Sequence, residues 1–462
     1  MDDSYRYMLM GLFAIAAALL TWAGGLSALQ SIAIVIIVLF KSATFLFWKR
    51  KLSFGFIAIA LLLIFRVLDV DHLIRYSGLD IVIFLISMMI VVGYLERNHF
   101  FEFIIGRLIQ RIGSRGNLLV FVMLLLAAAT AALINEITSI LIMTAIVIHL
   151  ASEYKVNPVP FVLMTVFATN IGSSASVIGN PAGVIIALKG GLSSADFLRW
   201  AAPVSLVSLL AAIGVMFLMF RKEIDKFGQS VRENYSSGES ELVERHRLIA
   251  PLVLFSAVIV ALMLHSWIEQ VMGLEKNTML IGVASIGAGA AMLLSRHEAA
   301  DLVERRVDWW TMMYFMFLFA AVGSLEYTGI IDILSAKMGA IGAGSLAMTS
   351  VVVLVAGGLM SAVLDNVLAV SVMVPIVENL RSAAPELGYP LWWVLLFAVT
   401  FFGNLTFVGS TANIVALGIL HKRQWGHIGF WQWLKPGFVI TLVTSAIAFG
   451  MLAVQYPLMS GG

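Results

Sequence analysis

The chain has no cysteine, which excludes disulfide bonds and thiolate metal sites. Charged residues make up only 12% of its 462 residues, and the net charge of +2 gives no indication of a nucleic-acid partner. The sequence also lacks His or carboxylate spacings typical of a metal cage, and it lacks the nucleophile and base pairs of an enzyme. We therefore expect neither an enzyme nor a bound cofactor.

Hydrophobic residues, in contrast, make up 61% of the chain, and several uninterrupted apolar runs reach about 20 residues, the length that crosses a bilayer. No soluble core needs so many apolar residues, so we predict an all-α integral membrane protein in contact with the lipid bilayer. The first apolar run lacks a basic leader and a cleavage site, which predicts a retained helix. We expect a prokaryotic inner (plasma) membrane, with the N-terminus in the cytoplasm.

The apolar runs fall into two classes. Simple spans are predicted near residues 8–27, 29–48, 53–68, 79–95, 197–220, 247–268, 276–294, 308–325 and 434–455. Four further stretches are too long for one crossing and contain polar or Gly residues near the middle, at 117–150, 158–190, 346–378 and 390–420. We interpret the first and third as re-entrant hairpins, and the other two as broken helices.

The chain also repeats itself at an offset of 230 residues. Asn135 and Glu136 return as Asp365 and Asn366, and the correspondence runs without a gap from about residue 63 to 187. Such a duplication in a membrane chain is typical of transporters whose substrate site lies between the two halves.

Positive charge then indicates how the halves are oriented, because Lys and Arg near span ends favour the cytoplasm. With two hairpins, the basic clusters at 49–51, 97–115, 221–222, 305–306 and 422–423 all fall inside. Segment 327–345, the repeat partner of 97–115, carries only Lys337 and falls outside. Each copy then holds an odd number of crossings, which predicts two inverted-topology repeats with about 11 transmembrane helices plus two re-entrant hairpins.

These patterns predict four segments along the chain. They are an N-terminal transmembrane helix at 1–28, a first inverted repeat at 29–220, a solvated cytoplasmic linker at 221–246 and a second inverted repeat at 247–456. Within the repeats, stretches 97–113 and 327–342 are predicted to be amphipathic helices at the membrane surface.

The polar pairs at the hairpin tips are the first candidate site. Burying an ionisable side chain such as Glu136 at membrane depth costs at least about 2.5 kcal/mol, so it is expected to face a cavity. A cap for two short helices is the alternative, because helix ends leave unpaired backbone groups. Recurrence of a carboxylate beside an amide, now Asp365 and Asn366, favours binding of a coupling cation or proton.

The broken helices are the second candidate site. Gly, Pro and hydroxyl residues in a long apolar segment are typical of unwound backbone, whose carbonyls bind cations while the following helix N-terminus attracts an anion. Close helix packing is the alternative. The segments around 173–181 and 403–413 show this pattern at corresponding positions of the two copies.

The segments 361–376 and 403–415, with 133–138 and 170–181 in the first half, carry a family resemblance. The chain resembles the arsenite permease, sodium/proton antiporter and citrate-transporter-like permeases of the ion transporter superfamily, which includes the melanosomal P protein. The resemblance implies a scaffold part that forms a homodimer. It also implies a transport part whose hairpin tips and helix breaks hold the substrate and a coupling ion, sodium or proton. Mapped onto this chain, the resemblance selects as substrate- or ion-binding residues, which also include possible sodium ligands, Asn135, Glu136, Ser173, Ser174, Ser176, Asn180, Asp365, Asn366, Asn404, Thr406, Ser410, Thr411 and Asn413.

The chain departs from these relatives at its tips. It reads Asn135, Glu136 where many members have two amides before a carboxylate, and it lacks the Ser-Asn-Thr triplet of the dicarboxylate symporters. We therefore predict an ion-coupled secondary active transporter that moves a small anion or oxyanion-like solute such as arsenite by an elevator-type mechanism. The alternatives are a sodium/proton antiporter and a channel-like or sensory membrane protein.

Overall fold

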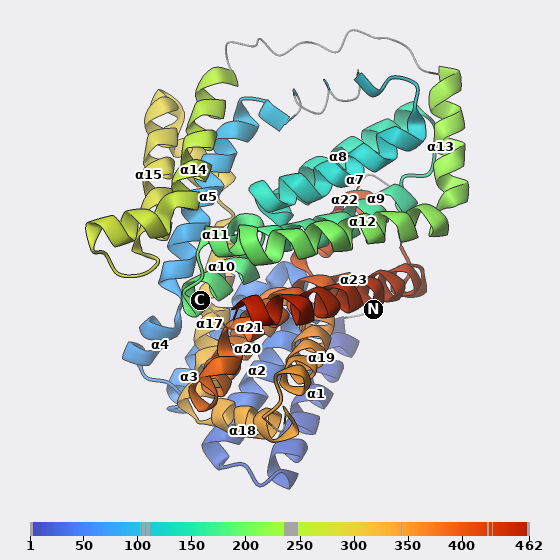
Figure 1. The fold of residues 1–462 in the computed structure, drawn as a ribbon. Helices are drawn as coiled ribbons and strands as arrows, with labels where there is room; N and C mark the ends of the chain where they lie inside the picture. Colours follow the sequence, from blue (N-terminus) through green and yellow to red (C-terminus); the bar gives the residue numbers. More distant parts are fainter. Residues whose placement is uncertain are drawn as a thin grey trace. The chain divides into compact units, whose positions relative to one another are not determined.

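The structure is a computed structural model that describes residues 3–459 apart from 102, 104–106, 108–110, 235–247, 343, 423, 424 and 427. Every regular element in this part of the chain is a helix (Figure 1). Helices satisfy their backbone hydrogen bonds internally, which the lipid interior requires. The prediction of an all-α membrane protein is confirmed.

The helices have the following bounds. The first half contains α1 (Asp3–Ala23), α2 (Ala28–Leu46), α3 (Lys51–Ile64), α4 (Val70–Tyr76), α5 (Leu79–Arg97), α7 (Gly116–Leu133), α8 (Glu136–Glu153), α9 (Val159–Gly172), α10 (Pro181–Gly190), α11 (Ser194–Asp196), α12 (Ala202–Met219) and α13 (Arg221–Asn234). The second half contains α14 (Ile249–Met272), α15 (Thr278–Leu294), α16 (Ala299–Arg306), α17 (Trp309–Tyr327), α18 (Ile330–Gly342), α19 (Leu346–Leu364), α20 (Asn366–Ala383), α21 (Pro385–Phe401), α22 (Thr411–Lys422) and α23 (Phe430–Met459).

The 230-residue repeat is present in the helix boundaries. Helices α5, α7, α8 and α10 begin at residues 79, 116, 136 and 181, and α17, α19, α20 and α22 begin 230 residues later, at 309, 346, 366 and 411. Backbone strain recurs too, because Asn135 and Asp365 both have positive φ, at 149° and 92°. The two copies therefore share a local fold. The inversion of one copy relative to the other, and the boundaries of the four predicted segments, stay predictions.

Among the described residues, nine helices are long and apolar enough to cross a membrane, or ten if α17 and α18, bent by 71°, count as one span. The nine include α7, α8 and α19, which the sequence predicts to be hairpin arms. Length and composition do not distinguish an arm from a crossing, so the count of 11 crossings and two hairpins stays a prediction. Residues 102, 104–106 and 108–110 of the predicted surface helix at 97–113 lie outside the described residues, whereas α18 occupies most of its counterpart at 327–342.

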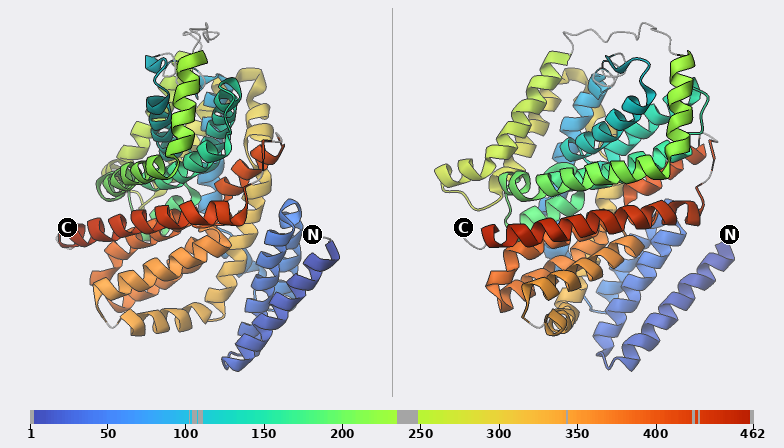
Figure 2. Two further views of the ribbon diagram at one scale, coloured as in Figure 1. Left: turned by 90° about the vertical axis from the view of Figure 1, so that its right-hand side faces the viewer. Right: turned by 45° about the vertical axis from the view of Figure 1, so that its right-hand side comes forward.

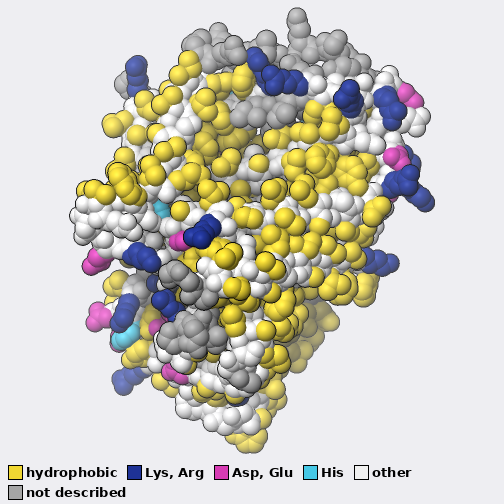
Figure 3. Space-filling view, in the orientation of Figure 1, with side chains coloured by type: hydrophobic (Ala, Val, Ile, Leu, Met, Phe, Trp, Pro, Cys, Tyr) yellow, Lys and Arg dark blue, Asp and Glu magenta, His cyan; other side chains and the backbone are white. Residues whose placement is uncertain are grey.

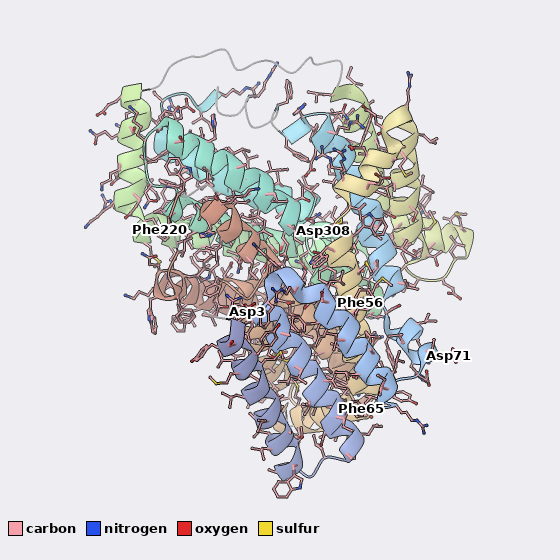
Figure 4. The ribbon with its side chains drawn as sticks, turned by 180° about the vertical axis from the view of Figure 1, so that it is seen from behind. Asp3, Phe56, Phe65, Asp71, Phe220 and Asp308 are labelled. Atoms are coloured by element: carbon pink, nitrogen blue, oxygen red, sulfur yellow. The ribbon has the colours of Figure 1, made fainter. Side chains whose placement is uncertain are left out.

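The chain divides into two compact units, each built from separate stretches of sequence. The first unit comprises residues 1–86, 308–352 and 371–388. In it, α17 packs against α2, α3 and α4. Two buried lysines donate hydrogen bonds to α17: Lys41 Nζ lies 3.1 Å from the Tyr314 hydroxyl, and Lys51 Nζ lies 3.3 Å from Thr311 Oγ1. The outer side of α3 is apolar: Phe56 and its C-cap Phe65 are 52% and 50% exposed (Figure 4), as expected of a lipid-facing surface.

The second unit comprises residues 87–307, 353–370 and 389–462, and it contains all 13 candidate site residues. Here α7 packs against α9, α14 against α15, and α12 against α23, and the last pair remains side by side in each view (Figures 1 and 2). Hydrophobic side chains cover much of the surface seen in Figure 3, which is what contact with lipid requires.

Helix α13 differs from the solvated linker that the sequence predicts at 221–246. Its apolar residues Ile224, Phe227 and Val231 follow one helical face and are buried, and α13 packs against α7. The Phe227 ring lies 5.1 Å from that of Phe161 on α9. The first part of the linker is thus an amphipathic helix that belongs to the second unit, while the rest of it, from residue 235, lies outside the described residues.

The inverted repeat can be tested at the entrances to the two hairpins. Arg115 and Ser345 are repeat partners, each exposed just before its first hairpin helix. Because the chain has no native cysteine, Arg115→Cys and Ser345→Cys should react with a membrane-impermeant maleimide from opposite faces, with 115 cytoplasmic. Arg221→Cys, 79% exposed, is the cytoplasmic control. Labelling of 115 and 345 from the same face would exclude the inversion.

Candidate functional site

The first tip lies between α7 and α8. Asn135 has positive φ, and its Oδ1 accepts a 2.8 Å hydrogen bond from Thr138 N, which caps the start of α8. Such a cap stabilises a helix by about 1 kcal/mol. Asn135 thus has the capping role that the sequence left open, and Glu136 then begins α8 with its side chain 2% exposed.

The second tip repeats this arrangement between α19 and α20. Asp365 Oδ1 accepts a 3.0 Å hydrogen bond from Leu368 N, so the first residue of each polar pair caps a helix. The second residue, Asn366, is 1% exposed. The two residues of each predicted pair therefore have different roles. The first residue caps the following helix, and the second has its side chain buried in the protein.

The two second residues meet. Asn366 Nδ2 donates a 2.9 Å hydrogen bond to Glu136 Oε1. The same carboxylate accepts weaker hydrogen bonds from Ser410 Oγ at 3.4 Å and from Ser173 Oγ at 3.5 Å. Four of the predicted residues are thereby brought together, two from each half of the chain.

This contact joins repeat partners, because Glu136 and Asn366 are 230 residues apart. In a two-fold arrangement, equivalent residues touch each other only beside the axis. An approximate two-fold axis that relates the two copies would therefore pass next to Glu136. The charge differs between these two equivalent positions, since Glu136 is an acid and Asn366 is an amide.

The first helix break separates α9 from α10. Residues 173–179 form two short 3-10 turns, and Asn180 bridges them. Its Nδ2 donates to Ser173 O at 3.1 Å and to Ser173 Oγ at 3.0 Å, while its Oδ1 caps Gly183 N of α10 at 2.7 Å. Ser176 Oγ donates to Ala132 O near the end of α7. Side chains thus replace the backbone hydrogen bonds that the break removes.

The second break, between α21 and α22, is closed in a similar way. Asn413 Nδ2 donates to Gly403 O at 2.8 Å and to Thr406 O at 3.0 Å. Thr406 Oγ1 donates to Ala362 O, at the position 230 residues after the Ser176 to Ala132 bond. A hydroxyl at the same position of each copy therefore connects the first break to α7 and the second break to α19.

Both breaks also depend on a glycine that lies against the start of the turn. A Cβ added to Gly179 would lie 2.0 Å from Ser173 O, and one added to Gly409 would lie 2.8 Å from Gly403 O. These contacts are again repeat partners. No larger residue fits, because the obstructing atoms belong to the backbone.

Asn170 is a site residue that the sequence analysis did not include among its candidates. It lies on α9 and is 1% exposed. Its Nδ2 donates to Asn404 Oδ1 at 2.8 Å and to Asn413 Oδ1 at 2.9 Å, which ties the two breaks together. Its position one helical turn before Ser173 could have suggested it, because both residues then share a helix face.

The remaining candidates have local roles. Ser174 Oγ is 2.6 Å from Ser205 Oγ of α12, and Thr411 begins α22. Among the hydrogen bonds of the described residues, none joins Ser174, Ser176, Thr406 or Thr411 to Glu136. The described part of the chain also holds no cluster of three or more His, Asp or Glu side chains that could bind a transition metal.

Three buried polar atoms of this cluster have no hydrogen-bond partner in the described structure. They are Asn170 Oδ1, Asn366 Oδ1 and Asn404 Nδ2. Leaving such a group unpaired costs about 1–3 kcal/mol. Their concentration within one network indicates a place where a further ion or solute group would be stabilised.

The close approach at Gly179 yields a stability prediction. Gly179→Ala should lower the free energy of unfolding by about 1–3 kcal/mol, because overpacking against fixed backbone forces the break to shift. The measurement is the thermal unfolding of purified protein in detergent. The matched control is Gly418→Ala in α22, where nothing lies within 4 Å of the added Cβ. Equal stability of the two variants would contradict the tight turn.

Comparisons with known proteins point to one family. Residues 34–398 match the model of the citrate transporter family. The 46 kDa membrane protein of Mycobacterium leprae is 30% identical over 389 residues, which cover 83% of this chain and 88% of that protein. The human P protein is 24% identical over 466 residues, which cover 84% of this chain and 55% of the P protein.

A solved structure shows the same fold. The YdaH transporter of Alcanivorax borkumensis, described as having an unusual topology, is similar with a TM-score of 0.55 at 16% identity over 84% of this chain and 87% of that one. An uncharacterised transporter of Mycobacterium tuberculosis is 30% identical over 380 residues, 82% of this chain and 86% of that protein. The chain is therefore a membrane transporter rather than an enzyme, and it belongs to the citrate transporter family.

Proposed function

We propose that the chain is an ion-coupled secondary active transporter in which Glu136 binds the coupling ion, a proton or sodium. The observation that carries this proposal is the buried carboxylate of Glu136, whose hydrogen-bond donors among the described residues are the neutral groups of Asn366, Ser410 and Ser173. A carboxylate charge is costly at this depth unless a cation or proton neutralises it.

The groups around Glu136 also suit a small hard cation. Ser173 and Ser410 bring hydroxyl oxygens, and Asn366 brings an amide oxygen that has no partner among the described residues. Hard cations such as sodium prefer oxygen ligands of this kind. Both halves contribute to this ligand set, so binding of the ion would hold the two tips together.

For the transported solute, we propose a small anion or oxyanion-like solute such as arsenite, moved by an elevator-type displacement of the site-bearing helices. The N-termini of α10 and α22 follow the two breaks, and helix N-termini favour negatively polarised groups. The amides of Asn180, Asn404 and Asn413 lie at these breaks. A homodimer in a prokaryotic inner membrane, with a cytoplasmic N-terminus, belongs to the same proposal.

Sodium/proton exchange is a second candidate. It is favoured by the composition of the site, because none of the 13 candidate residues or Asn170 is Lys, Arg or His. A site with carboxylates and no cationic side chain suits a cation better than a free anion. In this scheme Glu136 would bind either a sodium ion or a proton, but not both.

The role of Glu136 is tested by Glu136→Gln, which retains an oxygen that can accept from Asn366 and Ser410 but removes the charge. Solute flux into proteoliposomes should no longer respond to a proton or sodium gradient, while expression and thermal stability stay close to wild type. Glu153→Gln, the same change at the 50% exposed end of α8, is the control. Full gradient-driven flux in Glu136→Gln would remove Glu136 from the coupling site.

A sodium jump separates the two candidate functions. Proteoliposomes that contain a pH-sensitive dye and no solute should remain silent when sodium is added, if the protein couples an ion to a solute. Direct sodium/proton exchange would instead change the internal pH with sodium alone, and Glu136→Gln would abolish the change. A sodium response in the absence of solute would therefore replace our first candidate by the second.

A further inference from the structure

The amide cluster of Asn170, Asn404 and Asn413 has only one hydrogen-bond orientation. Asn413 Nδ2 faces two backbone carbonyls, Gly403 O and Thr406 O, so it must be the nitrogen of that amide. Asn413 Oδ1 therefore faces Asn170 and needs a donor there, which is Asn170 Nδ2 at 2.9 Å. No other orientation of Asn413 works, because backbone carbonyl oxygens accept hydrogen bonds and cannot donate them.

The orientation of the Asn404 amide is also determined by its neighbours. Asn170 Nδ2 also faces Asn404 at 2.8 Å, so Asn404 must present its Oδ1. Rotating either amide to pair the remaining atoms would bring two acceptors or two donors together elsewhere. Asn170 Oδ1 and Asn404 Nδ2 are therefore left over by necessity, and neither has a partner in the described structure.

We infer that Asn170 Oδ1 and Asn404 Nδ2 form a hydroxyl-recognition subsite for the transported solute. A hydroxyl group donates one hydrogen bond and accepts another, so a single hydroxyl-bearing group can satisfy both atoms. The two atoms belong to amide groups that are joined by the 2.8 Å hydrogen bond from Asn170 Nδ2 to Asn404 Oδ1. Both residues are buried, at 1% and 0% exposed, so their amides would bind a hydroxyl group without competition from bulk water.

The subsite exists once in the chain, although the sequence around it is duplicated. The repeat partners of Asn170 and Asn404 are Thr400 and Ser174. Thr400 Oγ1 donates to Leu396 O at 2.7 Å within its own helix, and Ser174 Oγ pairs with Ser205 Oγ at 2.6 Å. Because these hydroxyls are satisfied locally, we assign one hydroxyl-bearing solute to each chain.

This inference rests on the proposed function, because it divides that site into an ion position at Glu136 and a solute position at Asn170 and Asn404. Two classes of solute carry the required group: an uncharged oxyacid such as arsenous acid, and a hydroxycarboxylate such as citrate. The chemistry recognised is the same in both. A solute that lacks a hydroxyl leaves the buried amide atoms unpaired and should be rejected.

The test is solute exchange in proteoliposomes that hold purified full-length protein. The probes are radiolabelled citrate, its deoxy analogue tricarballylate and arsenite, with Mg²⁺ present because the site has no cationic side chain to balance a trianion. If citrate is a substrate, wild type should prefer it over tricarballylate by at least about 100-fold. If arsenite is the substrate, it alone should exchange.

Asn404→Leu removes the amide at nearly constant volume. The preference for citrate over tricarballylate should fall to nearly one, or arsenite exchange should fall at least tenfold, depending on which probe wild type carries. Asn404→Ser, which introduces the residue of the first half, is the second variant should the leucine substitution unfold the protein. Asn157→Leu, at an exposed amide outside the site, is the control.

Three results would overturn the subsite: equal exchange of citrate and tricarballylate by wild type, exchange of none of the three probes, or unchanged selectivity in both Asn404 variants. The failure of the proposed function is distinguishable from these. The proposed function is judged by whether solute flux in Glu136→Gln responds to an ion gradient, whereas the subsite is judged by the solute preference of wild type and of the Asn404 variants. Retained coupling in Glu136→Gln would reject the ion position and leave the subsite standing.

Discussion

The hydrogen bond from Asn366 to Glu136 is the interaction on which the rest of the site depends. It joins the starts of α8 and α20 at 2.9 Å, and it does so between residues that occupy the same position in the two copies of the repeat. A buried carboxylate between two helix breaks would be unstable without donors on both sides. Ser173 and Ser410, one from each break, supply the other two donors.

The helix breaks are stable because side chains form hydrogen bonds with backbone groups that have no partner within the interrupted helices. Asn180 spans the first break and Asn413 the second, and the hydroxyls of Ser176 and Thr406 bind each break to the end of the neighbouring hairpin helix. The duplicated geometry ends at the polar centre. There the first half provides the acid and the second half provides the amide, so the two copies share a scaffold but differ in chemistry.

Much of the helical pattern could be predicted from the sequence, because polar residues deep in apolar runs have few explanations. The interruptions at Asn135, Asp365 and both Gly-rich stretches coincide with helix ends in the structure. The division of roles within each tip pair could not be predicted, since it depends on which residue adopts positive φ and caps the next helix. The number of crossings and the inversion of the copies are defined by which helices traverse the bilayer, and the length and composition of a helix do not determine this.

Asn170 and α13 show two other limits of the sequence. Asn170 lies inside a regular helix, where the sequence gives no sign of a break. Its position one turn before Ser173 is a weak indication, and the contacts with Asn404 and Asn413 are what identify it as part of the site. In α13, the apolar spacing of Ile224, Phe227 and Val231 was present in a segment whose charges suggested a solvated loop. Charge density alone was therefore misleading, because a helix can bury one face while the other stays hydrated.

The central claim is that one carboxyl group, at Glu136, is held by an amide from the other half and binds the coupling ion. Infrared difference spectroscopy of the purified transporter, recorded between high and low concentrations of protons or sodium, measures this group directly. The account predicts a carboxyl band that disappears in Glu136→Gln and shifts in frequency in Asn366→Ala. A difference spectrum that neither variant alters would contradict it.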